Sequence, residues 1–147
     1  MGATKKCRKG GNHRALLVIK TEPSEYSWAD LVREAVTVWD GVKAAPAIKN
    51  IQRMKPGDKA LIYHTGKERR IVGIAEITSL PYYEPTSSEP LIKVAAREEL
   101  PTAVTLKTIK DSGSFKDWDL VRLPRLSVVP VSETQWTYVL TRAGLRN

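Results

Sequence analysis

The side chains best able to do chemistry in this sequence are two histidines and four tryptophans, scattered along the chain. His64 ends an apolar run, where its imidazole could bond a ligand, act as a general base, or satisfy local hydrogen bonds. Trp39 precedes Asp40 and Gly41, a turn-forming pair, and an indole beside a turn can line a pocket. Trp136 falls on the apolar face of an expected helix, which predicts a core position.

Common catalytic and cofactor-binding signatures are missing from the sequence. It contains no G-x-x-x-x-G-K-[ST] phosphate loop, no G-x-G-x-x-G dinucleotide motif and no G-x-S-x-G nucleophile motif. The single Cys7 and the two distant histidines, His13 and His64, do not provide the ligand set of a zinc site. We therefore expect no metal, no cofactor, and a protein that binds its target without catalysing a reaction.

Length and composition predict one compact intracellular domain. The chain has 147 residues, of which 41% are apolar and 27% charged, close to the averages of globular domains. It has neither the ~18 consecutive apolar residues of a membrane span nor the apolar centre of a secretory signal. Cys7 is the only cysteine, so no internal disulfide is possible. We expect a monomer that contacts no membrane.

The net charge of +8 lies mostly at the N-terminus. Residues 1–20 hold six basic and no acidic side chains, whereas the remaining 127 residues hold 18 basic and 16 acidic ones. Residues 1–14 are nearly devoid of apolar side chains, which predicts a flexible arm. Such an arm either touches a phosphate backbone or stays solvated without a partner. The candidate backbone contacts are Lys5, Lys6, Arg8, Lys9 and Arg14.

The pattern of apolar residues predicts an α+β fold. Strands grouped in the middle of the chain with helices at its periphery favour a curled mixed sheet over a βαβ repeat. Predicted strands cover residues 15–19, 60–64, 70–78, 91–96, 120–122 and 126–131. Predicted helices begin after Ser27, cover residues 46–54 and 105–110, and begin again after Ser132 to end at Gly144. Residues 39–42 are expected to form a turn.

Several blocks of this chain coincide in order and spacing with those of a known family. They are KTEP at residues 20–23, WDGVK at 39–43, MKPGD at 54–58, IYHT at 62–65, IVGIAE at 71–76, YEPT at 83–86 and RLSVVPV at 125–131. Together the blocks cover nearly everything outside the arm. The chain thus resembles the EVE domain, a PUA-like family related to the YTH-domain readers of methylated RNA. On this resemblance the EVE domain occupies residues 15–147.

The resemblance implies a PUA-like mixed β pseudo-barrel flanked by short helices, with a pocket near the end of the first strand. It also implies binding of nucleic acid, DNA or RNA, that carries a modified base such as methylated or hydroxymethylated cytosine. Carried over onto this sequence, Trp39 would be an aromatic wall of the pocket. The other residues expected at the pocket or its mouth are Thr21, Glu22, Pro23, Val42, Lys43, Ala45, Pro46, His64, Arg125 and Ser127.

The residue types agree with such a pocket. Stacking on an indole holds a flipped base, and hydroxyl, carboxylate and cationic groups read its edge. Where the family commonly continues with Arg-Asn-Tyr-Gln after Gly-Val, this chain has residues 43–46, which lack amide and phenol groups. The ligand is therefore expected to differ from that of better-known members. The alternatives are a salt bridge for Glu22 within its loop and a backbone hydrogen bond for the hydroxyl of Thr21.

Two other functions remain open at this point. Some ASCH domains, also PUA-like, are small amidohydrolases that act on modified cytidines through Lys, Thr and Glu. Lys20, Thr21 and Glu76 stand in loosely comparable places in this chain, so an enzyme is the second hypothesis. The third is an RNA-binding adaptor that contacts a protein partner through the Pro- and Ser-rich segment at residues 81–90.

Overall fold

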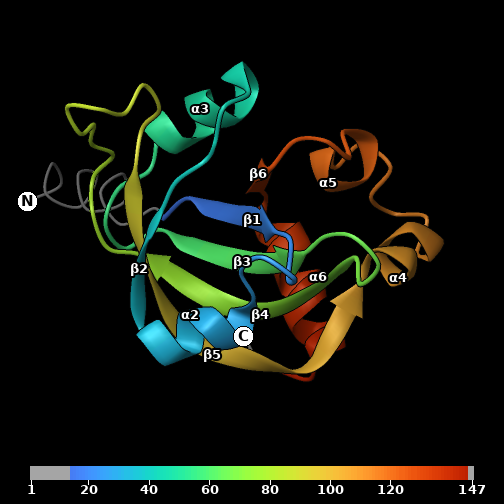
Figure 1. Ribbon diagram of the computed structural model, residues 1–147. Coiled ribbons are helices and arrows are strands. Elements are labelled where there is room, and N and C mark those ends of the chain that lie inside the picture. Colours follow the sequence, from blue (N-terminus) through green and yellow to red (C-terminus); the bar gives the residue numbers. More distant parts are fainter. Residues whose placement is uncertain (1–13, 146–147) are drawn as a thin grey trace, which may run out of the picture.

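The computed structural model describes residues 14–145, which fold around one curled sheet of six strands (Figure 1). The strands lie in the order β2-β5-β4-β3-β1-β6. Their bounds are Leu16–Thr21 (β1), Val36–Trp39 (β2), Lys59–His64 (β3), Arg70–Ile77 (β4), Ile92–Thr105 (β5) and Val128–Val131 (β6). The α+β class and the curled mixed sheet expected from the sequence are confirmed.

The pairing of β1 with β3 determines where loops meet. These two strands are parallel, whereas every other pair of neighbouring strands in the sheet is antiparallel. Thr21 lies opposite His64, so β1 and β3 end at the same edge of the sheet. There the backbone N–H of Thr65 donates to the carbonyl of Thr21 at 2.9 Å. The loop after β1 and the turn after β3 are therefore held side by side.

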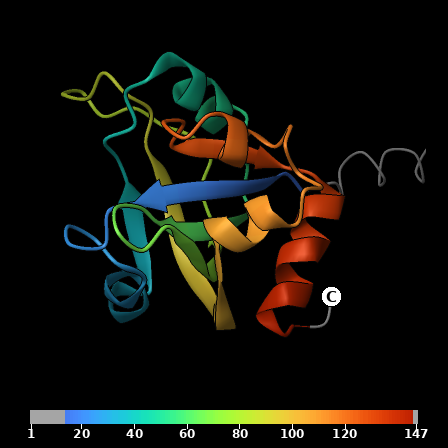
Figure 2. The ribbon, with the colours of Figure 1, turned by 90° about the vertical axis from the view of Figure 1, so that its right-hand side faces the viewer.

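Short helices surround the sheet. They are Trp28–Glu34 (α2), Ala45–Gln52 (α3), Leu106–Asp111 (α4), Asp119–Arg122 (α5) and Glu133–Ala143 (α6). The helix α6 packs against β5 and α3 against β6, on separate sides of the sheet (Figure 2). This arrangement leaves the edge where β1 and β3 end free of a long helix.

Capping residues fix the helix ends that the sequence predicted. The Ser27 hydroxyl accepts from the N–H of Asp30 at 3.1 Å, and the Asp30 carboxylate accepts from the N–H of Ser27 at 2.8 Å. Ser132 and Gln135 form the same reciprocal pair at the start of α6. That helix ends at Gly144, whose φ of 90° is the left-handed conformation expected of a stop.

The core is built on the buried faces of the strands and helices. Trp136, Val139 and Leu140 are buried on the inner face of α6, as predicted. The indole of Trp28 lies against β4 at Gly73, where a Cβ atom would come within 2.6 Å of the ring. The glycine in this strand thus makes room for the tryptophan at the start of α2.

Three predictions of secondary structure were wrong or incomplete. Residues 120–122 belong to the helical turn α5, because the N–H groups of Val121 and Arg122 both donate to the carbonyl of Trp118. The strand β2 was missed, since it has only four residues and its valines are exposed. The strand predicted at 91–96 continues to Thr105, because Pro101 lies in an irregular stretch of β5 where no ladder hydrogen bond is lost.

Candidate functional site

A pocket of about 470 Å³ lies where the ends of β1 and β2 approach each other. We call it the Trp39 pocket. Its lining comes from the end of β1 and the following loop, the end of α2, and the end of β2. The lining residues are Lys20, Thr21, Glu22, Glu25, Tyr26, Glu34, Thr37, Val38, Trp39, Asp40 and Gly41. The volume falls in the range of ordinary small-molecule sites.

Trp39 forms a firmly held wall of this pocket. It is the last residue of β2 and only 8% exposed, so most of the indole is packed in the core. The ring of Tyr26 meets it edge to face, with centroids 6.0 Å apart and planes at 87°. The Tyr26 hydroxyl donates to Glu34 at 2.6 Å, and burial together with this carboxylate raises the pKa of Tyr26. The aromatic pair is therefore fixed in orientation.

The loop after β1 places a carboxylate beside the aromatic pair. Glu22 accepts from the N–H and the hydroxyl of Ser24 at 3.2 and 3.1 Å, and from the hydroxyl of Thr65 at 3.3 Å. These donors, first the Ser24 backbone N–H, lower the pKa of Glu22. Within residues 14–145, no lysine or arginine forms an ion pair with Glu22. Its carboxylate stays ionised at neutral pH and can accept further hydrogen bonds.

The hydroxyl of Thr21 makes a hydrogen bond to the backbone, which the sequence analysis gave as the alternative to a ligand contact. Its hydroxyl donates to the carbonyl of Tyr26 at 2.7 Å, which closes the loop after β1. The hydroxyl oxygen can still accept a hydrogen bond. Thr21 therefore shapes the loop, and its remaining polarity lies at the pocket wall.

The charge of the Trp39 pocket is negative. Four carboxylates line it, those of Glu22, Glu25, Glu34 and Asp40, against the single ammonium of Lys20. The Lys20 ammonium donates to the carbonyl of Pro124 at 2.9 Å, and burial lowers its pKa. A ligand with hydrogen-bond donors fits this lining, whereas a phosphate group would be repelled by it.

His64 lies behind the pocket and does not line it. It is 7% exposed, and its Nε2 accepts from the backbone N–H of Trp28 at 3.0 Å. Its Nδ1 lies 2.7 Å from Glu68, so the ring proton belongs on Nδ1, from where it is donated to the carboxylate. The imidazole thus connects the start of α2 to the turn after β3.

The remaining expected site residues lie around the pocket without lining it. Val42 is buried in the core, while Lys43, Ala45 and Pro46 are exposed around the start of α3. Pro23 is half-buried in the loop after β1. Ser127 lies beside β1, its carbonyl accepting from the N–H of Lys20 at 3.0 Å, and Arg125 is exposed two residues earlier. None of residues 42–46 lines the Trp39 pocket, where Val38 supplies an aliphatic side chain.

Several lining residues were not found from the sequence. Tyr26, Glu34 and Thr37 approach the pocket only because α2 runs straight into β2, which folds back beside the end of β1. The residues carry no motif of their own. These residues could have been found by predicting that residues 36–39 form a strand paired with β5, because this pairing positions the end of α2.

The basic arm lies outside the described residues except for Arg14, which is exposed before β1. Within residues 14–145, no three His, Cys, Asp or Glu side chains come together to hold a metal ion. Over the same range, no helix has the length and apolar character needed to cross a membrane.

The curled mixed sheet, with a pocket at the ends of its first two strands, is a PUA-like domain. Residues 15–142 match the model of the EVE domain, and the chain belongs to that family. An NMR structure of Rpa0253 from Rhodopseudomonas palustris is 34% identical to this chain, with a TM-score of 0.85. The superposition covers 90% of this chain and 95% of that one.

Thymocyte nuclear protein 1 is a further relative. The human protein is 26% identical over 95% of this chain and 77% of its own length, whereas the match to the chicken protein covers 54% of that protein. A crystal structure of human THYN1 in complex with DNA containing 5-methylcytosine shares the fold. Its TM-score is 0.81 at 22% identity, covering 90% of this chain and 99% of that one.

The geometry speaks against the amidohydrolase hypothesis. Glu76 pairs with Lys59 at the start of β3, whereas Thr21 lies opposite His64 at its end. The two side chains are therefore separated by about 17 Å along the strands. An ASCH structure from Zymomonas mobilis shares the fold alone, with a TM-score of 0.57 at 12% identity. Lys20, Thr21 and Glu76 do not form one site in this chain.

Proposed function

We propose that this chain is a non-catalytic nucleic-acid-binding module that holds a modified base in the Trp39 pocket. The modified base is a methylated or hydroxymethylated cytosine or a close analogue. The observation that carries the proposal is the meeting of Trp39 with Thr21 and Glu22 around one pocket of about 470 Å³. The family and the DNA complex of human THYN1 support the same class of partner.

The chemistry of the lining favours a base with an exocyclic amino group. Carboxylates accept hydrogen bonds from the amino group of cytosine, and Glu22 and Asp40 lie on the lining with that capacity. Stacking of a base against an aromatic side chain is worth about 1–3 kcal/mol. The negative lining keeps phosphates out, so only the base of an extruded or single-stranded nucleotide enters.

The proposal also covers the oligomeric state of the protein and where it acts. We expect a monomer that acts inside the cell, since one domain contains the whole pocket and the chain has a single cysteine. The N-terminal arm remains a candidate for phosphate contacts, with the same five basic residues.

Substitution of two equally buried tryptophans tests the proposal. Trp39 and Trp136 are 8% and 9% exposed, but Trp136 lies on α6 and does not line the pocket. Trp39→Leu and Trp136→Leu should lower thermal stability to a similar extent, because each removes a buried aromatic ring. Only Trp39→Leu should weaken binding to a 5-methylcytosine oligonucleotide, by about 5- to 150-fold for the lost stacking.

Binding is measured by fluorescence anisotropy below the melting temperature of both variants, with an unmodified oligonucleotide beside the methylated one. The parent protein should prefer the methylated strand. If Trp39→Leu binds as tightly as the parent, or if Trp136→Leu loses as much, the pocket is not the binding site.

A further inference from the structure

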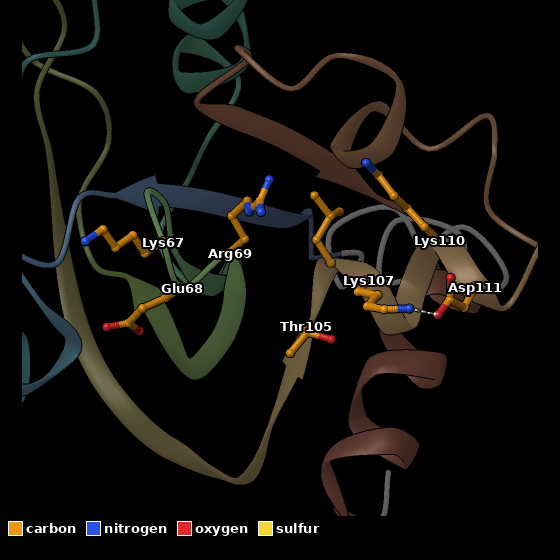
Figure 3. Close-up of a pocket in the computed structure, with 8 residues that line it drawn as sticks. Lys67, Glu68, Arg69, Thr105, Lys107, Lys110 and Asp111 are labelled. Carbon is orange, nitrogen blue, oxygen red and sulfur yellow. Dashed lines mark hydrogen bonds and ion pairs between the residues drawn. The ribbon is translucent and has the colours of Figure 1, made fainter.

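A second hollow, of about 420 Å³, lies between the turn after β3 and α4 (Figure 3). We call it the basic cleft. Its lining residues are Lys67, Glu68, Arg69, Thr105, Leu106, Lys107, Lys110 and Asp111. Arg69 and Lys110 reach to the same side of the cleft in Figure 3, while Lys67 extends away along the turn. None of these side chains takes part in the Trp39 pocket.

The positive charges of the basic cleft are largely uncompensated. Lys107 is neutralised by Asp111 at 2.7 Å, and Glu68 is engaged by His64 and by Arg70 at 2.7 and 3.1 Å. Within residues 14–145, the other three cations of the cleft form no ion pair. These cations are Lys67, Arg69 and Lys110.

The two walls of the cleft are tied together by the backbone. The N–H of Leu106 donates to the carbonyl of Arg69 at 2.9 Å, and Arg70 lies opposite Thr105 in the β4–β5 ladder. Arg69 itself has a φ of 44°, in the left-handed region, at the end of the turn. The backbone positions from which the cations extend across the cleft are therefore set before a ligand arrives.

Positive side chains connect the cleft to the Trp39 pocket. The Lys20 ammonium, which lines that pocket, lies 5.4 Å from the ring centre of Tyr63. Burial raises the pKa of Tyr63, and the charge of Arg69 partly offsets this rise. Tyr63 thus has Lys20 over its ring and Arg69 within electrostatic reach. Cations from both the pocket and the cleft therefore lie near Tyr63.

We propose that the basic cleft binds backbone phosphates of the nucleic-acid strand whose base occupies the Trp39 pocket, with Arg69 and Lys110 as the principal contacts. This inference rests on the proposed function. Phosphates carry most of the affinity of nucleic-acid binding and need cations, of which the acidic Trp39 pocket offers only Lys20 against four carboxylates. The cleft supplies them on the other side of the turn.

The test compares two double variants of the full chain that remove the same charges. One is Arg69→Gln with Lys110→Gln in the cleft. The other is Arg142→Gln with Lys49→Gln, which are exposed cations in the last turns of α6 and α3. Lys110 likewise stands in the last turn of its helix. Affinity for a 5-methylcytosine oligonucleotide is measured from 50 to 200 mM salt, and 5-methyldeoxycytidine provides a ligand with the base and no phosphate.

The cleft variant should lower the slope of log affinity against log salt by about 1 to 2, as expected for two lost phosphate contacts. Between the two salt concentrations the parent should then lose roughly 4- to 16-fold more affinity than the cleft variant. The control variant should keep the slope of the parent. Both variants should keep the parent's affinity for the nucleoside and its preference for the methylated strand.

The outcomes separate the two proposals. If the parent binds and discriminates but the cleft variant keeps its salt slope, the cleft proposal fails and the proposed function stands. Equal loss of slope in both variants shows a diffuse charge effect, which also overturns the cleft. If the parent binds neither ligand, the proposed function fails and the inference that rests on it fails as well.

Discussion

The Trp39 pocket and the basic cleft lie on opposite sides of one turn, residues 65–69, and carry opposite charges. Thr65 and Gly66 contact Glu22 on the pocket side, whereas Lys67 and Arg69 line the cleft. Figure 1 shows the turn after β3 between the loop after β1 and α4. Folding has thus separated acidic from basic side chains across a few residues.

Because the charges are separated, the nearly balanced charge of residues 21–147 does not describe the charge at either site. Residues 21–147 hold 18 basic and 16 acidic side chains, a balance that argues against a surface coated evenly with phosphate contacts. The structure gathers four carboxylates at one site and three unpaired cations at another. A nearly neutral domain can therefore offer one site suited to a base and another suited to phosphates.

The largest effect is expected from His64, which connects the turn after β3 to the start of α2. His64→Ala removes the acceptor of the buried N–H of Trp28 and releases Glu68. Loss of the buried hydrogen bond and of packing should lower the free energy of unfolding by about 2–3 kcal/mol. Urea denaturation measures the change.

His64→Gln is the matched control, because an amide oxygen can still accept from Trp28. It should lose less than half as much stability as His64→Ala. If both variants keep the parent's stability and His64→Ala abolishes binding to the nucleoside, the imidazole contacts the base, as the resemblance to the family first implied.

The residues of the Trp39 pocket that the sequence analysis named lie in two short blocks of the chain. Residues 20–22 of the KTEP block and residues 39–41 of the WDGVK block line one pocket. The sequence did not predict Tyr26 or Glu34, since their approach depends on α2 leading directly into the short strand β2. The local sequence pattern does not show that β2 folds back beside the end of β1.

The role of His64 shows a second limit. A histidine at the end of a strand, next to an expected pocket, has the same sequence signature whether it faces a ligand or the core. Its partners, the N–H of Trp28 and the carboxylate of Glu68, belong to segments that only the folded chain brings together. The long strand β5 was hidden for a similar reason, because Pro101 is tolerated only at its irregular stretch.

An intermediate effect is expected at Gly66, which forms the pocket side of the turn. A Cβ atom there would lie 2.6 Å from Oε1 of Glu22, and the φ of Gly66 is 74°. Gly66→Ala should cost about 1–2 kcal/mol for the left-handed backbone and push the Glu22 carboxylate away. Preference for the methylated base should fall, while the salt slope set by the basic cleft should not change.

Gly113 provides the control for backbone strain. Its φ is 72°, and a Cβ atom there would meet nothing within 4 Å. Gly113→Ala should lose similar stability and keep the base preference. A salt slope that falls in Gly66→Ala would show that the pocket and the cleft are not independent sites.

The smallest effect concerns the ionisation of Glu22, the acceptor that the proposed function assigns to the base. Hydrogen bonds from Ser24, and then from Thr65, hold the pKa of Glu22 below its ordinary value. Because the folded pKa is depressed, the stabilisation is present above the ordinary pKa and is lost as pH falls through the folded one.

Carbon-detected NMR titration of the Glu22 carboxyl group should therefore give a midpoint below the ordinary value of about 4.3. Ser24→Ala removes the hydroxyl donor but keeps the backbone N–H, so it should raise the midpoint only part of the way. A Glu22 midpoint at or above the ordinary value would show that Ser24 and Thr65 do not hold the carboxylate by these hydrogen bonds at the pocket.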